Sequence, residues 1–133
     1  MHITLESDYA VRIVSRLARQ GGRMDAKRIA EETGVTLRFS LKILRKLVTG
    51  GLVRSYKGTK GGYELARPAK DISLCDVIET VEGPYALSRC VGEPDFRCSR
   101  SPDGSCCKFR RVYADISQLV RQRLSQVTFE EKN

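Results

Sequence analysis

The chain has 133 residues, of which 41% are hydrophobic and 30% charged, and its formal net charge is +8. This length suits one compact domain with an appendage, and no apolar run approaches the roughly 18 residues that a membrane span needs. Because residues 1–10 also lack the layout of a secretion signal, we expect a soluble, cytoplasmic protein without a membrane partner.

The positive surplus is confined to the first half of the chain. Residues 1–70 contain fifteen Lys and Arg against six Asp and Glu, whereas residues 71–133 contain nine against ten. A basic surface attracts phosphate backbones, anionic lipids or acidic proteins. Charge alone therefore favours nucleic acid only modestly, and a choice among these partners needs a motif.

Three helices are predicted in the first fifty residues. Apolar residues recur at helical spacing over 6–20, 26–33 and 36–49, and Gly34 makes a sharp turn between the last two. The third helix opens on polar and basic residues. Two helices joined by so short a turn are typical of a helix-turn-helix, although a helical hairpin without a DNA role has the same pattern.

A β-hairpin is predicted next, with strands at 52–56 and 63–66 around a glycine-rich tip. The tip carries Lys57 and Lys60, and its glycines allow the backbone to approach a phosphate closely. A solvated turn with incidental lysines is the alternative. Because a helix-turn-helix followed by such a hairpin is a winged helix, we assign residues 1–70 to a winged helix-turn-helix DNA-binding region.

Residues 71–133 are predicted to form a short helix at 72–83, a sensor loop at 85–106 and a dimerisation helix at 107–127. Cys75 falls within the first of these helices, where we expect a buried small hydrophobe. The last helix carries a broad apolar stripe that a second copy of the chain would cover, giving a two-fold dimer; packing against its own domain is the alternative. The predicted fold class is mainly α with a small β-hairpin.

Four cysteines crowd the sensor loop and the start of the last helix: Cys90, Cys98, Cys106 and Cys107. Seven residues lie between Cys90 and Cys98, and seven between Cys98 and Cys106. Thiolates on a loop can converge on one soft metal centre, and both iron–sulfur clusters and zinc suit such ligands. The adjacent Cys106 and Cys107 are poorly placed to bind the same ion, so we expect one of them to serve. A reversible disulfide without metal is the alternative.

A family resemblance rests on YAVRIV near the start, GTKGGYELAR in the hairpin, ISLCDVIETVEG after it and the spaced cysteines, in that order. The chain resembles, over nearly its whole length, the bacterial regulators typified by IscR, NsrR and RirA. The resemblance implies a homodimeric winged-helix transcription factor that binds double-stranded promoter DNA. It also implies an iron–sulfur cluster, either 2Fe–2S or 4Fe–4S, whose state reports iron, nitric oxide or oxidative stress.

By the same resemblance, the cluster ligands are three cysteines, namely Cys90, Cys98 and Cys107. Cys107 keeps register with Asp115, and Cys106 is the alternative to it. Arg110 stands where IscR-like members have a histidine ligand, and arginine cannot bind iron. Asp8 matches the aspartate that NsrR-like members supply from the partner subunit, and is the candidate fourth ligand.

On the DNA side, the resemblance and the charge of the tip give five candidate contacts: Thr36, Arg38, Lys42, Lys57 and Lys60. Arg38 can pair bidentately with guanine, while the lysines can read a base or hold phosphate. Leu41 stands where IscR-like members have an acidic residue that discriminates bases, so their operator preferences are not transferred.

Two other functions compete with the cluster-sensing regulator. One keeps the DNA-binding fold and makes the cysteines a thiol switch, and the other is a protein-interaction module that docks an enzyme. We do not expect an enzyme, because no nucleophile has a placed base and no phosphate-binding loop or paired carboxylate motif occurs.

Overall fold

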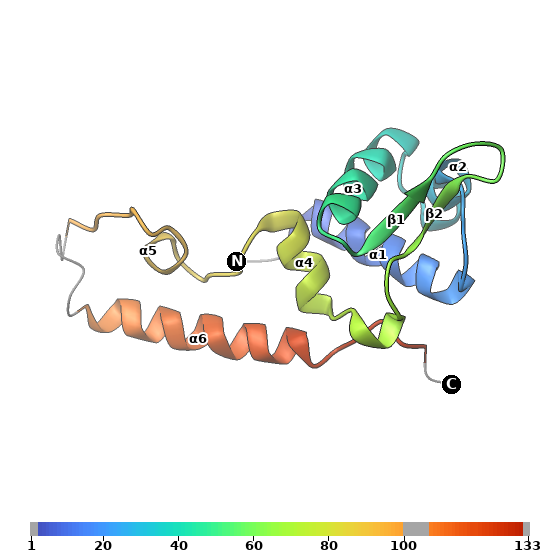
Figure 1. The fold of residues 1–133 in the computed structure, drawn as a ribbon. Helices are drawn as coiled ribbons and strands as arrows, with labels where there is room; N and C mark the ends of the chain where they lie inside the picture. Colours follow the sequence, from blue (N-terminus) through green and yellow to red (C-terminus); the bar gives the residue numbers. More distant parts are fainter. Residues whose placement is uncertain (1–2, 100–106, 132–133) are drawn as a thin grey trace.

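The order of secondary-structure elements is a run of three helices, a hairpin, and three further helices. The structure is a computed structural model that describes residues 3–99 and 107–131. Along the chain it contains α1 (Leu5–Gln20), α2 (Ala26–Thr33), α3 (Leu37–Thr49), β1 (Val53–Tyr56), β2 (Gly62–Leu65), the 3-10 turn η1 (Ala69–Asp71), α4 (Leu74–Glu82), α5 (Arg89–Gly92) and α6 (Lys108–Ser125) (Figure 1).

Polar caps set the limits of the first three helices. The side chains of Thr4, Asp25 and Thr36 each accept a hydrogen bond from a backbone N–H in the first turn of α1, α2 and α3. Such caps satisfy donors that have no partner inside the helix. Gly34 ends α2 at φ 73°, a left-handed conformation that glycine adopts without strain. The predicted helix-turn-helix is confirmed, with boundaries within one residue.

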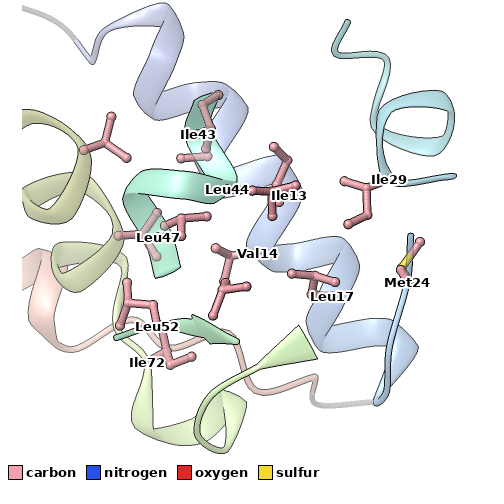
Figure 2. Close-up of a cluster of buried hydrophobic side chains, with 14 residues drawn as sticks. Ile13, Val14, Leu17, Met24, Ile29, Ile43, Leu44, Leu47, Leu52 and Ile72 are labelled. Atoms are coloured by element: carbon pink, nitrogen blue, oxygen red, sulfur yellow. The ribbon is translucent and has the colours of Figure 1, made fainter. Parts of the chain in front are cut away.

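The core lies between α1, α3 and the hairpin (Figure 2). Helices α1 and α3 face each other through apolar side chains that are at most 1% exposed: Ile13, Val14, Leu17, Ile43, Leu44 and Leu47. Four further apolar residues pack around this core: Met24, Ile29, Leu52 and Ile72. Burial of one such side chain contributes about 1.5–3 kcal/mol, so the core fixes α3 firmly against α1.

The hairpin pairs β1 with β2 in antiparallel register, from Val53 opposite Leu65 to Tyr56 opposite Gly62. It also gains a third partner that the sequence did not predict. Met24, in the link between α1 and α2, exchanges two backbone hydrogen bonds with Tyr63, of 2.9 and 2.8 Å. This bridge attaches the hairpin to the helix-turn-helix.

Helix α4 joins the two halves of the molecule. It begins with a capping box between Ser73 and Asp76, and it contacts α1 and α3 on one side and α6 on the other. Figure 1 shows α6 extending away from the body of the domain, with the α5 segment beside it. Among residues 3–99 and 107–131, no helix combines the length and the hydropathy that crossing a bilayer would require.

The segment predicted as an irregular loop contains one helical turn, α5. An ion pair between Arg89 and Glu93, with nitrogen–oxygen distances of 3.0 and 3.2 Å, spans this turn. The Arg89 guanidinium also lies over the ring of Phe96. A turn of four residues is too short to show a hydrophobic period, which explains why sequence patterning missed it.

The close approach of the hairpin to the link before α2 predicts a large effect of one glycine substitution. A Cβ at Gly62 would lie 2.5 Å from the Met24 carbonyl oxygen, whereas a Cβ at Gly58 would meet nothing within 4 Å. Both glycines have positive φ. We expect Gly62→Ala to lower the free energy of unfolding by about 1–3 kcal/mol more than Gly58→Ala, measured by urea titration. Equal losses would show that the bridge tolerates a methyl group.

Candidate nucleic-acid interface and cysteine loop

All five predicted DNA contacts are exposed in the structure. Thr36, Arg38 and Lys42 lie at the start and on the outer face of α3, and Lys57 and Lys60 lie in the hairpin tip. Figure 1 shows α3 and the hairpin tip at the top of the molecule and α6 at the bottom. The Thr36 hydroxyl accepts from the Phe39 N–H at 3.2 Å and can still donate to an acceptor outside the protein.

A carboxylate from α1 lies within the basic face of α3. Glu6 Oε1 is 2.8 Å from Lys46 Nζ and 3.9 Å from Lys42 Nζ. The Glu6 side chain is 23% exposed and that of Lys42 is 58% exposed. Glu6 therefore offsets part of the positive charge of this face and restrains the lysines. Sequence reasoning missed Glu6 because its partners lie on another helix, about forty residues further on.

The predicted ligand cysteines lie on the loop and at the start of α6. Cys90 lies in α5 and Cys107 is the N-cap residue of α6, and the side chains of Cys90, Cys98 and Cys107 are all half-buried. Cys90 Sγ is 3.1 Å from Ser88 Oγ. Cys106 lies outside the described residues. Accessible cysteine thiols are the donors that an iron–sulfur or zinc centre requires.

The loop is tied to α6 near these cysteines. Arg110 of α6 donates from Nε to the Cys90 carbonyl oxygen at 3.1 Å. The Leu87 N–H donates to the buried hydroxyl of Ser117 at 2.8 Å. Within the described part of the chain, no three Cys, His, Asp or Glu side chains are gathered closely enough to hold a metal ion.

Asp8, the predicted fourth ligand, lies on the exposed side of α1. Its Oδ2 is 3.1 Å from Arg12 Nη2, and its side chain is 50% exposed. An exposed pair four residues apart on a helix contributes only a few tenths of a kcal/mol, roughly. Binding a metal would therefore cost little in lost ion pairing.

One carboxylate connects α4, α6 and the beginning of the sensor loop. Glu79 forms a two-pronged ion pair with Arg121, with both nitrogen–oxygen distances 3.0 Å, and accepts the Tyr85 N–H at 2.6 Å. Burial by itself raises the pKa of Glu79, but the hydrogen bonds from Arg121 and Tyr85 outweigh burial and leave the pKa below its ordinary value. Residues 42 positions apart give no sequence signal of such a pair.

The apolar residues of α6 lie on two faces. Tyr113, Val120 and Leu124, on the same face as Ser117, are half-buried. Ser117 is buried toward the loop, and the C-terminal segment returns to the domain, where the Leu74 N–H donates to the Val127 carbonyl at 2.8 Å. The other face is 37–64% exposed along its apolar side chains, namely Phe109, Val112, Ile116 and Leu119. In the part of the chain that the structure describes, these four side chains form an exposed outer face of α6.

The hairpin of β1, the basic tip and β2 is the wing of this fold. A helix-turn-helix with an exposed basic second helix and a basic wing defines a class of proteins, the winged-helix DNA-binding regulators. The family model described as Rrf2, an iron-dependent transcriptional regulator, matches residues 3–131. The chain belongs to the Rrf2 family. It is a DNA-binding transcription regulator and not an enzyme.

Relatives and solved structures agree with this assignment. A Mycobacterium tuberculosis protein named as an HTH-type transcriptional regulator is 39% identical over 133 residues, which cover 98% of this chain and 80% of that protein. IscR of Xenorhabdus nematophila is 29% identical, with 98% and 78% covered. The oxidized form of Staphylococcus aureus CymR superposes with a TM-score of 0.72 at 26% identity, covering 98% of this chain and 94% of that chain. T. potens IscR shares the fold, with a TM-score of 0.74 at 24% identity. The superposition covers 97% of this chain and 83% of that chain.

The burial of Cys75 predicts a difference in thiol reactivity. Cys75 is 5% exposed, as its place in the helical pattern predicted. Burial raises the pKa of its thiol, and the neighbouring Glu79 carboxylate adds to this rise. In metal-free, reduced protein we expect Cys75 to be alkylated at least about tenfold more slowly than Cys90, followed by peptide mass spectrometry. Equal rates would mean that the α4–α6 junction opens readily.

The Glu79–Arg121 pair predicts a pH-dependent contribution to stability. Because the pKa of Glu79 is lowered from 4.5, the stabilisation is present above that value and is lost as pH falls through the lower, folded-state pKa. We expect Glu79→Gln to lower the free energy of unfolding by about 1 kcal/mol at pH 7, a value that allows for the exposure of Arg121 to solvent. Below pH 4.5 the loss should become progressively smaller.

Urea titrations at several pH values measure this difference. Glu31→Gln, on the exposed side of α2, is the matched control and should have a small effect at every pH. A Glu79→Gln effect that does not change with pH would contradict the assignment.

Proposed function

We propose that this regulator binds promoter DNA as a homodimer in the cytoplasm, and that an iron–sulfur cluster on the sensor loop determines when it binds. The observation that carries the proposal is the set of accessible thiols on a segment that Arg110 ties to α6. The family's description as iron-dependent supports it. The division of the chain at residue 70 into a DNA-binding region and a sensor arm belongs to the same proposal.

In this proposal α3 enters the major groove and the wing contacts the flanking backbone. Arg38 reads a guanine edge, Thr36 and Lys42 contact a base or phosphate, and Lys57 and Lys60 hold phosphate. The exposure of all five side chains supports these roles.

The proposed cluster ligands are Cys90, Cys98 and Cys107, with Cys106 as the alternative to Cys107. The fourth is Asp8 of the partner subunit. When bound, such a cluster would supply a centre that gains or loses electrons, or disassembles, in response to oxidants or iron supply. The chain's own contribution would be to hold the loop against α6 through Arg110 and Ser117.

The homodimer is proposed to form through the outer face of α6. Four apolar side chains in successive turns of one helix, all exposed, are typical of an interface with a second copy of the same helix. A two-fold axis through α6 would present two copies of α3 to a palindromic site.

A second candidate is a thiol switch on the same fold. The likeness to S. aureus CymR, solved in an oxidized form, favours it. In that case two of the loop thiols would form a disulfide, passing two electrons to an oxidant such as a peroxide and releasing two protons.

Reconstitution of the cysteine variants with iron and sulfide under anaerobic conditions tests the cluster proposal. The wild-type protein should become coloured, with iron and sulfide in equal amounts. Cys90→Ala and Cys98→Ala should lose most of both, and a comparison of Cys106→Ala with Cys107→Ala identifies the third cysteine ligand. Cys75→Ala is the matched control and should retain the wild-type content.

Two outcomes would count against the cluster. The first is a wild-type protein that stays free of iron after reconstitution. The second is a disulfide that forms reversibly between loop cysteines in metal-free protein and changes its DNA binding, which would favour the thiol switch.

A further inference from the structure

One exposed side chain connects the first strand and the tip of the wing to the body of the domain. Arg23 precedes α2, outside the wing and outside α3. Its Cζ lies 3.4 Å from the centroid of the Tyr56 ring, at the end of β1. Its Nη1 donates to the carbonyl oxygen of Lys60, in the tip, at 3.3 Å. The Arg23 guanidinium therefore contacts both β1, which leads into the tip, and Lys60 within the tip.

The neighbouring contacts fix the base of the wing, and the tip has one backbone hydrogen bond of its own, from the Gly61 N–H to the Gly58 carbonyl oxygen at 2.9 Å. The residue after Arg23, Met24, is bonded through its backbone to Tyr63 in both directions. The Tyr56 hydroxyl donates to Glu64 Oε1 at 2.5 Å, which holds the ring in place beneath the guanidinium. The tip beyond this base, residues 57–60, is exposed throughout.

An exposed, glycine-containing tip loses conformational entropy when it settles on DNA. A contact that already holds the tip in the free protein reduces that loss. The planar guanidinium suits this task because it can stack on an aromatic face and donate hydrogen bonds from its edge at the same time. Both contacts are observed for Arg23, and both are made with the wing.

We propose that Arg23 is a positioning residue for DNA binding, which orders the wing so that Lys57 and Lys60 meet the DNA backbone. The inference rests on the DNA-binding function of the family and on the wing contacts proposed above. It assigns to Arg23 an effect on affinity that acts through the wing lysines and not through a phosphate contact of its own.

A double-mutant cycle separates these two routes. The probe is a duplex that the wild-type protein selects from a randomised library, and Kd is measured at one fixed salt concentration. The variants are Arg23→Met, the double variant Lys57→Ala/Lys60→Ala, and their combination. We expect Arg23→Met to raise Kd about three- to tenfold in the wild-type background, but less than about twofold when the wing lysines are absent.

Three further variants sharpen the test. Arg19→Met removes the same charge from the exposed end of α1 and should change Kd less than about twofold. Tyr56→Leu should reproduce the effect of Arg23→Met and should not add to it. Arg23→Lys, which keeps the cation but not the planar group, should fall between the wild-type protein and Arg23→Met. Thermal unfolding of each variant establishes that the protein measured is folded.

The outcomes are distinct. An equal effect of Arg23→Met with and without the wing lysines, or no effect in the wild-type background, would overturn the inference and leave the DNA-binding surface standing. If the wild-type protein selects no duplex, the proposed DNA surface fails and the inference fails with it.

Discussion

The packing of α4 between the DNA-binding helices and α6 is the constraint on which the rest of the molecule depends. Its buried residues Val77 and Val81 join the core that holds α3, while its Glu79 carboxylate holds both α6 and the start of the sensor loop. Burial of apolar side chains gives a large stabilisation that has no preferred direction. The Glu79 carboxylate, in contrast, fixes the orientation of α6 and the loop relative to α4 through hydrogen bonds from both. A displacement of the loop would therefore act on the same helix that contacts α3.

A series of contacts links Cys90 to α3. The Cys90 backbone is bonded to Arg110 on α6, Arg121 further along α6 is bonded to Glu79, and Lys46 of α3 lies 3.5 Å from the Val81 carbonyl of α4. These contacts join the loop, α6, α4 and α3 in that order, and the Glu79 junction is their link between α6 and α4.

Sequence patterning predicted the fold well where the physics is local. Helix caps such as Thr36, the hydrophobic period of α1 and α3, and the glycine-rich hairpin each involve residues a few positions apart, and their boundaries agree with the structure. The contacts it missed are polar and distant in sequence: Glu6 with Lys46, Glu79 with Arg121, and Arg23 with the wing. An exposed charged residue has the same appearance in a sequence whether or not it has a partner. The candidate site was predicted as a list of residues, and the network that positions them came from the structure.

The central claim is that the state of the cysteine loop controls binding by the winged helix. Its most direct test is the Kd of a single selected duplex, measured anaerobically at one salt concentration for the iron- and sulfide-loaded protein and for the same preparation after metal removal under reducing conditions. The account predicts that the two Kd values differ by about tenfold or more. Equal Kd values for fully loaded and metal-free protein would contradict it.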